Sequence, residues 1–437
     1  MFAVIKRGIM IQEIKIKNFR SFKEEVTFSF EASNDKFAED SQVVQINENV
    51  RLLRFAVVYG YNASGKSNLL HAIDFLHYFW TYKPGGMDEG TNVDPFKLDR
   101  TSSNEPTRFD LIFYVGNTKY SYQLELDRQQ VYWEKLSYYK STQPIMLFER
   151  RWENNQSVID FNNSGNGDKV SAAVKELITI NCLKNMSFFM ARNQVNVSLP
   201  LIDAAKDWMK GQIMPAIYPH TNLTNYAQRR TSTNQAITKH IVDFLHEADF
   251  NITNIQSNVI NQVISDDAIK FFLEDANTTQ EEKERIRKEK MIRQIRTIFE
   301  HTIETEEGKE TYSMEWENES VGTMRTFGLE AALFEAVQTQ SLLPIDEVYT
   351  SLHPKLLEKI LFEYLRTPSR TQLLVATHND GLLDLVDDLI RKDSVWFTEK
   401  KKSGVTDLYK LTDFRGVNRL SSIREAYRNK RFGATMN

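Results

Sequence analysis

The chain has 437 residues, of which 41% are hydrophobic and 26% are charged, and its net charge is −4 at pH 7. This composition is ordinary for a soluble globular protein, and the length allows two or three lobes with a sizeable core. The negative balance excludes a global basic field, and the single cysteine, Cys182, excludes an internal disulfide framework. No apolar run approaches the roughly 18 residues of a membrane span, and the N-terminus lacks signal-peptide features, so we expect a cytoplasmic location. Regular patterning begins just after Met10, so either Met1 or Met10 fits as the start.

Two alternating stretches, residues 11–17 and 26–30, predict an antiparallel pair of strands at the beginning of the chain. The segment Asn18-Phe19-Arg20-Ser21-Phe22 joins them. The next apolar run, residues 55–59, has the length and β-branched content of a buried strand, and residues 68–76 carry apolar side chains at helical spacing.

A glycine-rich loop lies between that strand and that helix. Gly60-Tyr61-Asn62-Ala63-Ser64-Gly65-Lys66-Ser67 matches the phosphate-binding pattern G-x-x-x-x-G-K-[ST] at every fixed position. Gly60 and Gly65 allow backbone conformations that a side chain would block. We expect Lys66 to reach the β- and γ-phosphates of ATP and the Ser67 hydroxyl to hold Mg²⁺.

A first strand ending in "IKNFRSF", ahead of a loop of the form "GxNxSGKSN", resembles the SMC/RecF/OLD branch of ABC-type ATPases. The resemblance implies an α/β fold, an ABC-type P-loop NTPase head with an antiparallel β subsheet and an inserted helical arm. It implies that Arg20 reaches the nucleotide phosphates, although a solvated cation at a strand end is the alternative. It also implies that the nucleotide contacts include Asn62, Ser64 and Asn68 of the loop.

Residues 95–151 are rich in predicted strands, at 109–115, 120–126 and 131–136, with Gly116-Asn117 as a turn. Their aromatic side chains could stack on bases, but a sheet core is the favoured interpretation, because aromatic residues suit any pleated surface. Residues 154–167, which are rich in Asn, Ser and Gly, predict a loop or linker.

The following region is helical in pattern. The predicted helices are 170–183, 201–214, 236–248, with a cap within 231–234, and 280–303, the longest. The last one carries a basic set: Lys283, Arg285, Arg287, Lys288, Lys290, Arg293 and Arg296. This set predicts a surface for nucleic acid or an acidic partner, whereas the interleaved glutamates equally favour a solvated helix with i,i+4 pairs.

Other polar residues of this region give weaker signals. Arg296, Glu300 and His301 loosely resemble the catalytic trio of ABC-linked anticodon nucleases, but their separation does not match. The eight histidines predict no metal cluster, because no pair has i,i+4 spacing on a predicted helix.

Motifs reappear after residue 311. Residues 319–325 resemble the ABC signature loop, which implies that the Ser320 hydroxyl and the Gly322 N–H grip the γ-phosphate on an opposing protomer. Residues 342–347 form an apolar strand that ends in two acids, the Walker B pattern. We expect Asp346 to hold Mg²⁺ through water and Glu347 to polarise the attacking water. Pro344 cannot donate to a sheet ladder, so it suggests a local bulge.

Residues 373–377 predict a buried strand that ends at His378, the switch position of the resembled family, where the imidazole would sense the γ-phosphate. The segment Leu352-His353-Pro354 after the acidic pair resembles RecF/OLD-type proteins, and the tail at 425–434 resembles the "YxxGRFGA" ending of stand-alone OLD-like ATPases.

These patterns predict three regions: an ATPase lobe at 1–150, a mainly helical arm at 151–310 and a second ATPase lobe at 311–437. The resemblance implies that two ATP molecules, with Mg²⁺, join two heads into a homodimer. Each nucleotide would meet the P-loop, Walker B and switch of one subunit and the signature of the other.

Three functions remain open from the sequence. The first is an ATP-driven homodimeric regulator in bacterial phage defence, similar to the ATPase subunits of the Septu and PARIS systems, with a nuclease or toxin effector on a separate chain. The second is a RecF-like ATP-dependent DNA clamp in repair. The third is an RNase contained within the arm.

Overall fold

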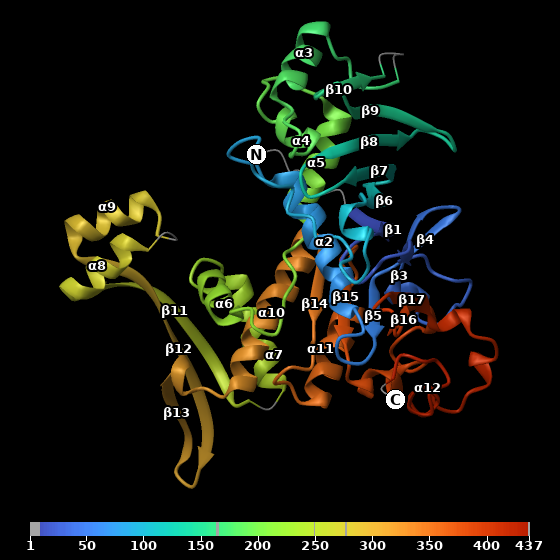
Figure 1. The fold of residues 1–437 in the computed structure, drawn as a ribbon. Coiled ribbons are helices and arrows are strands. Elements are labelled where there is room, and N and C mark those ends of the chain that lie inside the picture. Colours follow the sequence, from blue (N-terminus) through green and yellow to red (C-terminus); the bar gives the residue numbers. More distant parts are fainter. Residues whose placement is uncertain (1–8, 163–165, 249, 276–277, 436–437) are drawn as a thin grey trace. The chain divides into compact units, whose positions relative to one another are not determined.

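The computed structural model describes residues 9–162, 166–248, 250–275 and 278–435 of the chain (Figure 1). The chain divides into two compact units. Unit 1 contains residues 1–219, 336–350 and 357–437, and unit 2 contains residues 220–335 and 351–356.

An antiparallel sheet of seven strands in the described residues forms one layer of unit 1. In spatial order its strands are β10 (Gln156–Phe161), β9 (Pro144–Glu153), β8 (Val131–Tyr139), β7 (Thr118–Leu126), β6 (Thr107–Val115), β1 (Ile9–Lys17) and β2 (Val26–Ser29). Inward and outward side chains alternate along β6 and β7, as the sequence pattern requires. Tyr114, Tyr120 and Tyr122 are buried, which supports the sheet-core interpretation of the aromatic residues.

The predicted loop at 154–167 is wrong in part, because it contains β10. Asn154 and Asn155 both have positive φ, 51° and 61°, and form a tight hairpin turn between β9 and β10. Ser157 and Ile159 then point inward, so a sequence rich in polar residues still forms a strand. Residues 163–165 of the predicted loop lie outside the described residues.

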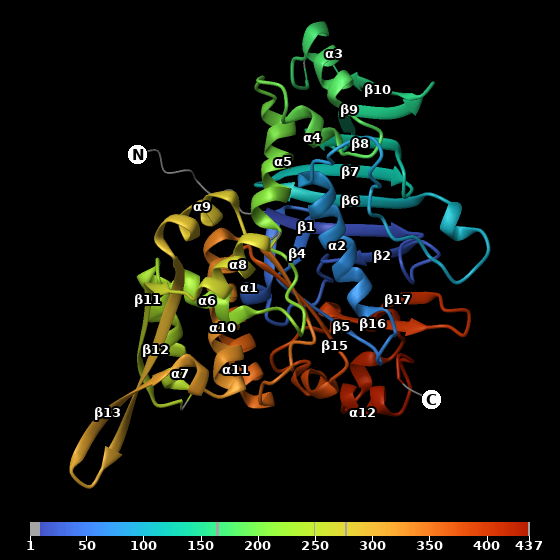
Figure 2. The same cartoon turned by 60° about the vertical axis from the view of Figure 1, so that its left-hand side comes forward.

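Helices of unit 1 cover this sheet (Figures 1 and 2). They are α2 (Lys66–Thr81), α3 (Ala172–Asn181), α4 (Phe188–Arg192) and α5 (Pro200–Gln212). Trp208 of α5 stacks on Phe113 at 3.9 Å between ring centroids, and Trp80 of α2 stacks on Phe189 of α4 at the same distance. Helices α3 to α5 therefore share the core of the first lobe, which is why unit 1 continues past the predicted boundary at residue 150 to residue 219.

The second sheet of unit 1 brings the motifs together. Its order is β14 (Leu342–Asp346), β15 (Gln372–Thr377), β5 (Phe55–Tyr59), β16 (Val395–Lys400) and β17 (Thr406–Lys410). All neighbours are parallel except β16 and β17. The carboxyl ends of parallel strands meet at one edge of a sheet, so the residues that follow β5, β14 and β15 share that edge.

Pro344 causes no bulge, contrary to the expectation. It pairs with Leu374 in a continuous register. Asp346 N donates to Ile217 O, and Ile217 N donates to Pro344 O, on the other side of β14. The nitrogen of Pro344 faces that short segment, where only isolated bridges form, so the missing donor leaves the ladder to β15 intact.

Unit 2 is built on a three-stranded antiparallel sheet. Its strands are β11 (Ile252–Val263), β12 (Met291–Thr305) and β13 (Gly308–Glu315), and its helices are α6 (Leu223–Thr231), α7 (Gln235–Glu247), α8 (Asp266–Glu274) and α9 (Gln280–Glu289). The predicted helix at 236–248 is confirmed, and Asn234 caps it.

The prediction of one helix over 280–303 is wrong. Helix α9 ends at Glu289, because Lys290 has a left-handed backbone (φ 53°) that terminates it. The β-branched residues beyond it enter β12, which pairs with strands on both sides. The predicted basic helical face is thus divided: Arg293 and Arg296 lie on β12, not on α9. The arm predicted as mainly helical also contains long strands.

The remaining elements are short or belong partly to each unit. They are α1 (Glu39–Gln42), β3 (Val43–Asn47), β4 (Val50–Leu53), α10 (Val321–Thr339), α11 (Pro354–Arg366), α12 (Ile423–Arg428) and the 3-10 helices η1 (Ser102–Asn104), η2 (Trp316–Asn318), η3 (Asp380–Leu385), η4 (Lys392–Ser394), η5 (Leu411–Asp413) and η6 (Val417–Arg419). Among the residues that the structure describes, no helix combines the length and the apolar character needed to cross a membrane.

Candidate functional site

The glycine-rich loop joins β5 to α2 through two glycines that no other residue could replace without displacement. Gly65 has φ 107°, and a Cβ there would lie 2.5 Å from Thr406 Oγ1 and 2.8 Å from Ser21 Oγ. A Cβ on Gly60 would lie 2.4 Å from Ser64 Oγ. The loop backbone therefore packs closely against its neighbours. Gly65 is the N-cap residue of α2. Backbone N–H groups at such a helix start favour an anion.

Lys66 is buried beneath this loop, with 4% of its side chain exposed. Its Nζ donates to Gly60 O at 3.0 Å and to Tyr61 O at 3.3 Å. It also lies 3.5 Å from Glu347 Oε1. The ammonium is thus held at the loop by two carbonyls and one carboxylate.

Ser67 and Asp346 meet across the sheet edge. Ser67 Oγ donates to Asp346 Oδ2 at 2.7 Å, whereas Asp346 Oδ1 is buried without a hydrogen-bond partner in the described residues. Burial raises the pKa of the Asp346 carboxyl above its ordinary value, against the hydrogen bond from Ser67, which lowers it. An orphaned carboxylate oxygen beside a serine hydroxyl fits a hard cation such as Mg²⁺, which takes oxygen ligands and keeps several waters. No group of three or more His, Cys, Asp or Glu suited to a metal occurs in the described residues.

Glu347 follows β14 directly and has positive φ, 49°. Its N–H donates to Ala376 O at 2.8 Å, which ties it to β15. Its Oε2 lies 2.7 Å from His378 Nδ1 and accepts from the His378 N–H at 3.3 Å. The two carboxylate oxygens therefore have different partners, Lys66 on one side and His378 on the other.

Arg20 lies in the turn between β1 and β2, with φ 50°. Its N–H donates to Asp94 O at 2.7 Å, and its Nε, 3.8 Å from Asp94 Oδ2, is buried without a hydrogen-bond partner in the described part of the chain. Ser21, the residue after Arg20, joins this turn to the start of α2, since Ser21 Oγ accepts from Asn68 Nδ2 at 2.6 Å.

The other predicted loop residues differ in exposure. Ser64 is fully buried, and its Oγ lies 2.7 Å from Thr398 Oγ1. Asn62 is exposed. Ser64 and Asn68 thus make contacts inside the protein that hold the loop in shape, while the side chain of Asn62 is open to solvent.

A known family matches residues 55–384 of the chain, and its description is "AAA domain, putative AbiEii toxin, Type IV TA system". The matched range contains the loop, the acidic pair and His378. The chain belongs to this family. It contains an AAA domain, and a domain of this kind uses a nucleotide, usually with Mg²⁺.

No curated protein matches the chain at a significant level. Among solved structures, the chain is similar to the SMC head domain from Thermotoga maritima, with 14% identity, a TM-score of 0.41 and coverage of 92% of this chain and 98% of that one. It is also similar to the Smc head domain with an extended coiled coil bound to the C-terminal domain of ScpA, from Pyrococcus furiosus, with 10% identity, a TM-score of 0.38 and coverage of 97% and 99%. Similarities this low support no inference about individual residues.

Sequence reasoning missed a polar cluster beside the acidic pair of this ATPase domain. Tyr218 hydroxyl donates to Asp74 Oδ2 at 2.7 Å and lies 2.7 Å from His71 Nδ1. Burial, helped by the charge of Arg20, lowers the pKa of His71 to about 4. The available signal was the position of His71, one helical turn after Ser67 on the same face of α2. Nothing in the sequence indicated Tyr218, which reaches the site because the preceding residues pair with β14.

The predicted signature residues of this ATPase domain belong to unit 2, whereas the P-loop, the acidic pair and His378 belong to unit 1. Ser320 Oγ accepts from Thr323 N at 3.0 Å at the start of α10. A Cβ on Gly322 would lie 3.3 Å from Ser351 O, so the glycine permits a close approach of two backbones.

The trio proposed for an RNase within the arm is not assembled. Glu300 and His301 are neighbours on β12 and point to opposite faces of its sheet. Glu300 accepts from the side-chain amides of Asn254 and Gln256, His301 Nε2 lies 2.6 Å from Glu319 Oε1, and Arg296 pairs with Glu315. These three residues therefore do not form one site in the described structure.

Proposed function

We propose that the chain binds and hydrolyses ATP with Mg²⁺, using the loop at 60–67 together with Asp346, Glu347 and His378. The observation that carries this proposal is the contact of Ser67 with Asp346, which leaves the second oxygen of a buried carboxylate without a partner. A cation beside a phosphate loop accounts for that arrangement.

Each residue then has a definite task. The loop N–H groups and Lys66 hold the β- and γ-phosphates, and Ser67 and Asp346 hold Mg²⁺, which supplies positive charge to the phosphate oxygens. The Nε of Arg20 is buried without a hydrogen-bond partner in the described residues, which suits a further phosphate contact. Glu347 orients and polarises the attacking water. His378 fixes the orientation of the Glu347 carboxylate, because its Nδ1 lies 2.7 Å from Glu347 Oε2.

We further propose that two copies close around two ATP molecules, with Ser320 and Gly322 of one copy facing the γ-phosphate held by the other. Support comes from the exposed His378, whose side chain is 55% accessible and able to meet a second chain. Binding and hydrolysis would then drive closing and opening of the pair.

The cellular role we propose is a cytoplasmic regulator of anti-phage defence, similar to stand-alone OLD-like ATPases such as those of Septu and PARIS, with a separate nuclease or toxin effector. The family description, which includes a putative toxin of a toxin–antitoxin system, supports a defence function. Under this proposal the ATPase reports a trigger to its effector through the closed dimer.

Mass photometry of wild-type protein and Glu347→Gln, each with and without ATP, tests the proposal. The variant keeps the size of Glu347 and a head group that forms hydrogen bonds but loses its charge, so it should bind ATP, turn over slowly and accumulate as a dimer. A variant that hydrolyses ATP at the wild-type rate would refute the role of Glu347. A monomer at saturating ATP would refute the dimer.

A further inference from the structure

A basic cavity of about 610 Å³ lies beside the C-terminal segment of unit 1. Its lining includes Lys392, Arg415, Asn418 and Arg419, and none of the described residues that line it is acidic. The cavity is separate from the loop and the acidic pair, since none of its lining residues belongs to them. We call it the C-terminal basic pocket.

Four cations at or beside this pocket have no carboxylate partner among the described residues. Arg415, Arg419, Lys430 and Arg431 are exposed, and none forms an ion pair with a carboxylate in the described chain. Arg431 Nη2 donates to Arg415 O at 3.4 Å, so these cations gather at one place. Neighbouring arginines behave differently: Arg424 and Arg428 both pair with Asp380, at 2.9 and 2.6 Å. Unpaired positive charge in a chain of net charge −4 indicates an anionic partner.

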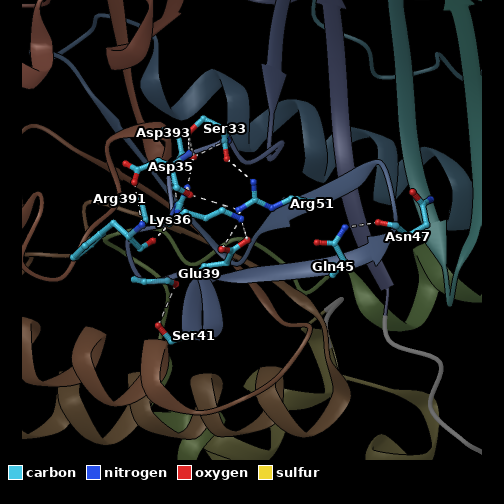
Figure 3. Close-up of polar contacts among 12 residues, drawn as sticks. Ser33, Asp35, Lys36, Glu39, Ser41, Gln45, Asn47, Arg51, Arg391 and Asp393 are labelled. Atoms are coloured by element: carbon cyan, nitrogen blue, oxygen red, sulfur yellow. Dashed lines mark hydrogen bonds and ion pairs between the residues drawn. The ribbon is translucent and has the colours of Figure 1, made fainter.

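Lys392, which lines the pocket, lies between two residues of a buried polar network, Arg391 and Asp393, whose contacts are drawn in Figure 3. Arg391 and Asp393, which flank Lys392, are at most 1% exposed and form two hydrogen bonds, at 2.9 and 2.7 Å. Asp393 Oδ2 also accepts from the N–H and the hydroxyl of Ser33, each at 2.7 Å, and Arg391 donates to Asp35 O at 3.0 Å. The turn that carries Lys392 therefore has a fixed backbone, although Lys392 itself pairs with Asp387 at 2.6 Å.

The tail that carries Lys430 and Arg431 is also anchored. Phe432 is 1% exposed and packs against Phe397 and Phe414, at 5.5 and 5.1 Å between centroids. Tyr427 hydroxyl donates to Ala434 O at 2.8 Å. The tail motif thus has a packing role, which holds the cations in place before any ligand arrives and lowers the entropy cost of binding.

We propose that the C-terminal basic pocket, with Lys430 and Arg431 beside it, binds the phosphate backbone of a nucleic acid. Guanidinium groups match phosphate oxygens in a bidentate way. The cations continue beyond the pocket along the tail, which suits a polymer of phosphates better than one free phosphate. The contact would be independent of base sequence. This binding is additional to ATP hydrolysis and does not rest on it.

Fluorescence anisotropy with a labelled DNA duplex of about 20 base pairs, on the full chain without nucleotide and over a range of salt, tests the proposal. The triple variant Arg415→Gln, Arg419→Gln and Arg431→Gln should lose at least about tenfold in affinity at low salt. The slope of log K against log salt should become shallower by about 0.9 for each lost phosphate contact, that is by about 2 to 3.

Two matched variants make the result specific. Lys83→Gln, Lys140→Gln and Lys210→Gln change the net charge equally at exposed positions of unit 1 and should leave affinity and slope near wild type. Arg415→Lys, Arg419→Lys and Arg431→Lys keep the charges and should retain the slope, which separates charge loss from misfolding. Wild-type protein that does not bind DNA would overturn the proposal, as would equal losses in the Arg→Gln and Lys→Gln triple variants.

Discussion

Ser67 Oγ donates a hydrogen bond to Asp346 Oδ2 at 2.7 Å, joining two residues that are 279 positions apart in the chain. The contact brings the start of α2 against the end of β14 and leaves Asp346 Oδ1 buried and unpartnered. Around it stand Lys66 and the Glu347–His378 pair. The predictions below follow from this arrangement.

Asp346→Asn should weaken the dependence of ATP binding on Mg²⁺. The amide keeps the shape of the side chain and an acceptor oxygen, but loses the charge that attracts a divalent cation. Calorimetry with ATP at rising Mg²⁺ concentration measures the change, and the wild type should show at least about tenfold stronger ATP binding with Mg²⁺ than without it, a coupling of about 1.4 kcal/mol. A variant with the same Mg²⁺ dependence as the wild type would remove Asp346 from the metal site.

Lys66→Ala should abolish measurable ATP binding, because it removes the cation closest to the predicted phosphate position. Lys66→Arg is the matched control: it keeps the charge but not the compact ammonium that fits between Gly60 O and Tyr61 O. Unchanged affinity in Lys66→Ala would show that the loop does not hold the nucleotide as proposed.

A mixture of Lys66→Ala and Ser320→Arg subunits tests the shared site. Neither variant should turn over alone, since one cannot bind ATP and the other places a bulky cation where a neighbour's γ-phosphate would dock. A mixed dimer has one intact site, formed by the P-loop of the Ser320→Arg subunit and the signature of the Lys66→Ala subunit. Weak recovery of hydrolysis is expected if one site can act alone, and none if both must fill. Full activity of isolated Ser320→Arg would exclude the shared site.

Stability should fall in mild acid because of His71. Its pKa in the folded chain is about 4, below its ordinary value, so between pH 6.5 and 4 the unfolded chain binds more protons than the folded chain. The free energy of unfolding is therefore level above about pH 6.5 and decreases toward pH 4. The groups facing the imidazole are Tyr218, Asp74, Arg20 and Asp94.

Denaturant unfolding at pH 7.5 and pH 5 measures this effect. Because the imidazole is only partly buried, we expect His71 to contribute on the order of 1 kcal/mol of the loss, after allowance for solvent screening. His71→Asn has no proton to gain in this range and should lose correspondingly less between the two pH values. An equal loss in both proteins would assign the acid sensitivity to other groups.

The local features of this protein were determined by short stretches of sequence. Glycines at positions 60 and 65, with Lys66 and Ser67 between a β-branched run and a helical pattern, are enough to specify a strand, loop and helix, because neighbouring residues alone decide those conformations. The alternation of apolar and polar residues in β1, β2, β6 and β7 was likewise sufficient to predict these strands, because it is a local pattern. The known family matches residues 55–384, a range that includes these glycines, Lys66 and Ser67.

Only the tertiary structure decided the features that depend on distant partners. Residues 291–305 form a strand because β11 and β13 pair with them, which overrides a helical pattern in the sequence. Pro344 does not interrupt the hydrogen bonds between β14 and β15, because its nitrogen faces a short segment at residues 213–217 and not β15. Tyr218 reaches Asp74 and His71 because the residue before it pairs with β14, and no local sequence pattern indicates this contact. Contacts of this kind join segments that are far apart in the chain. The sequence of one segment does not identify the other, because the favourable energy of pairing is gained only when both segments are in place.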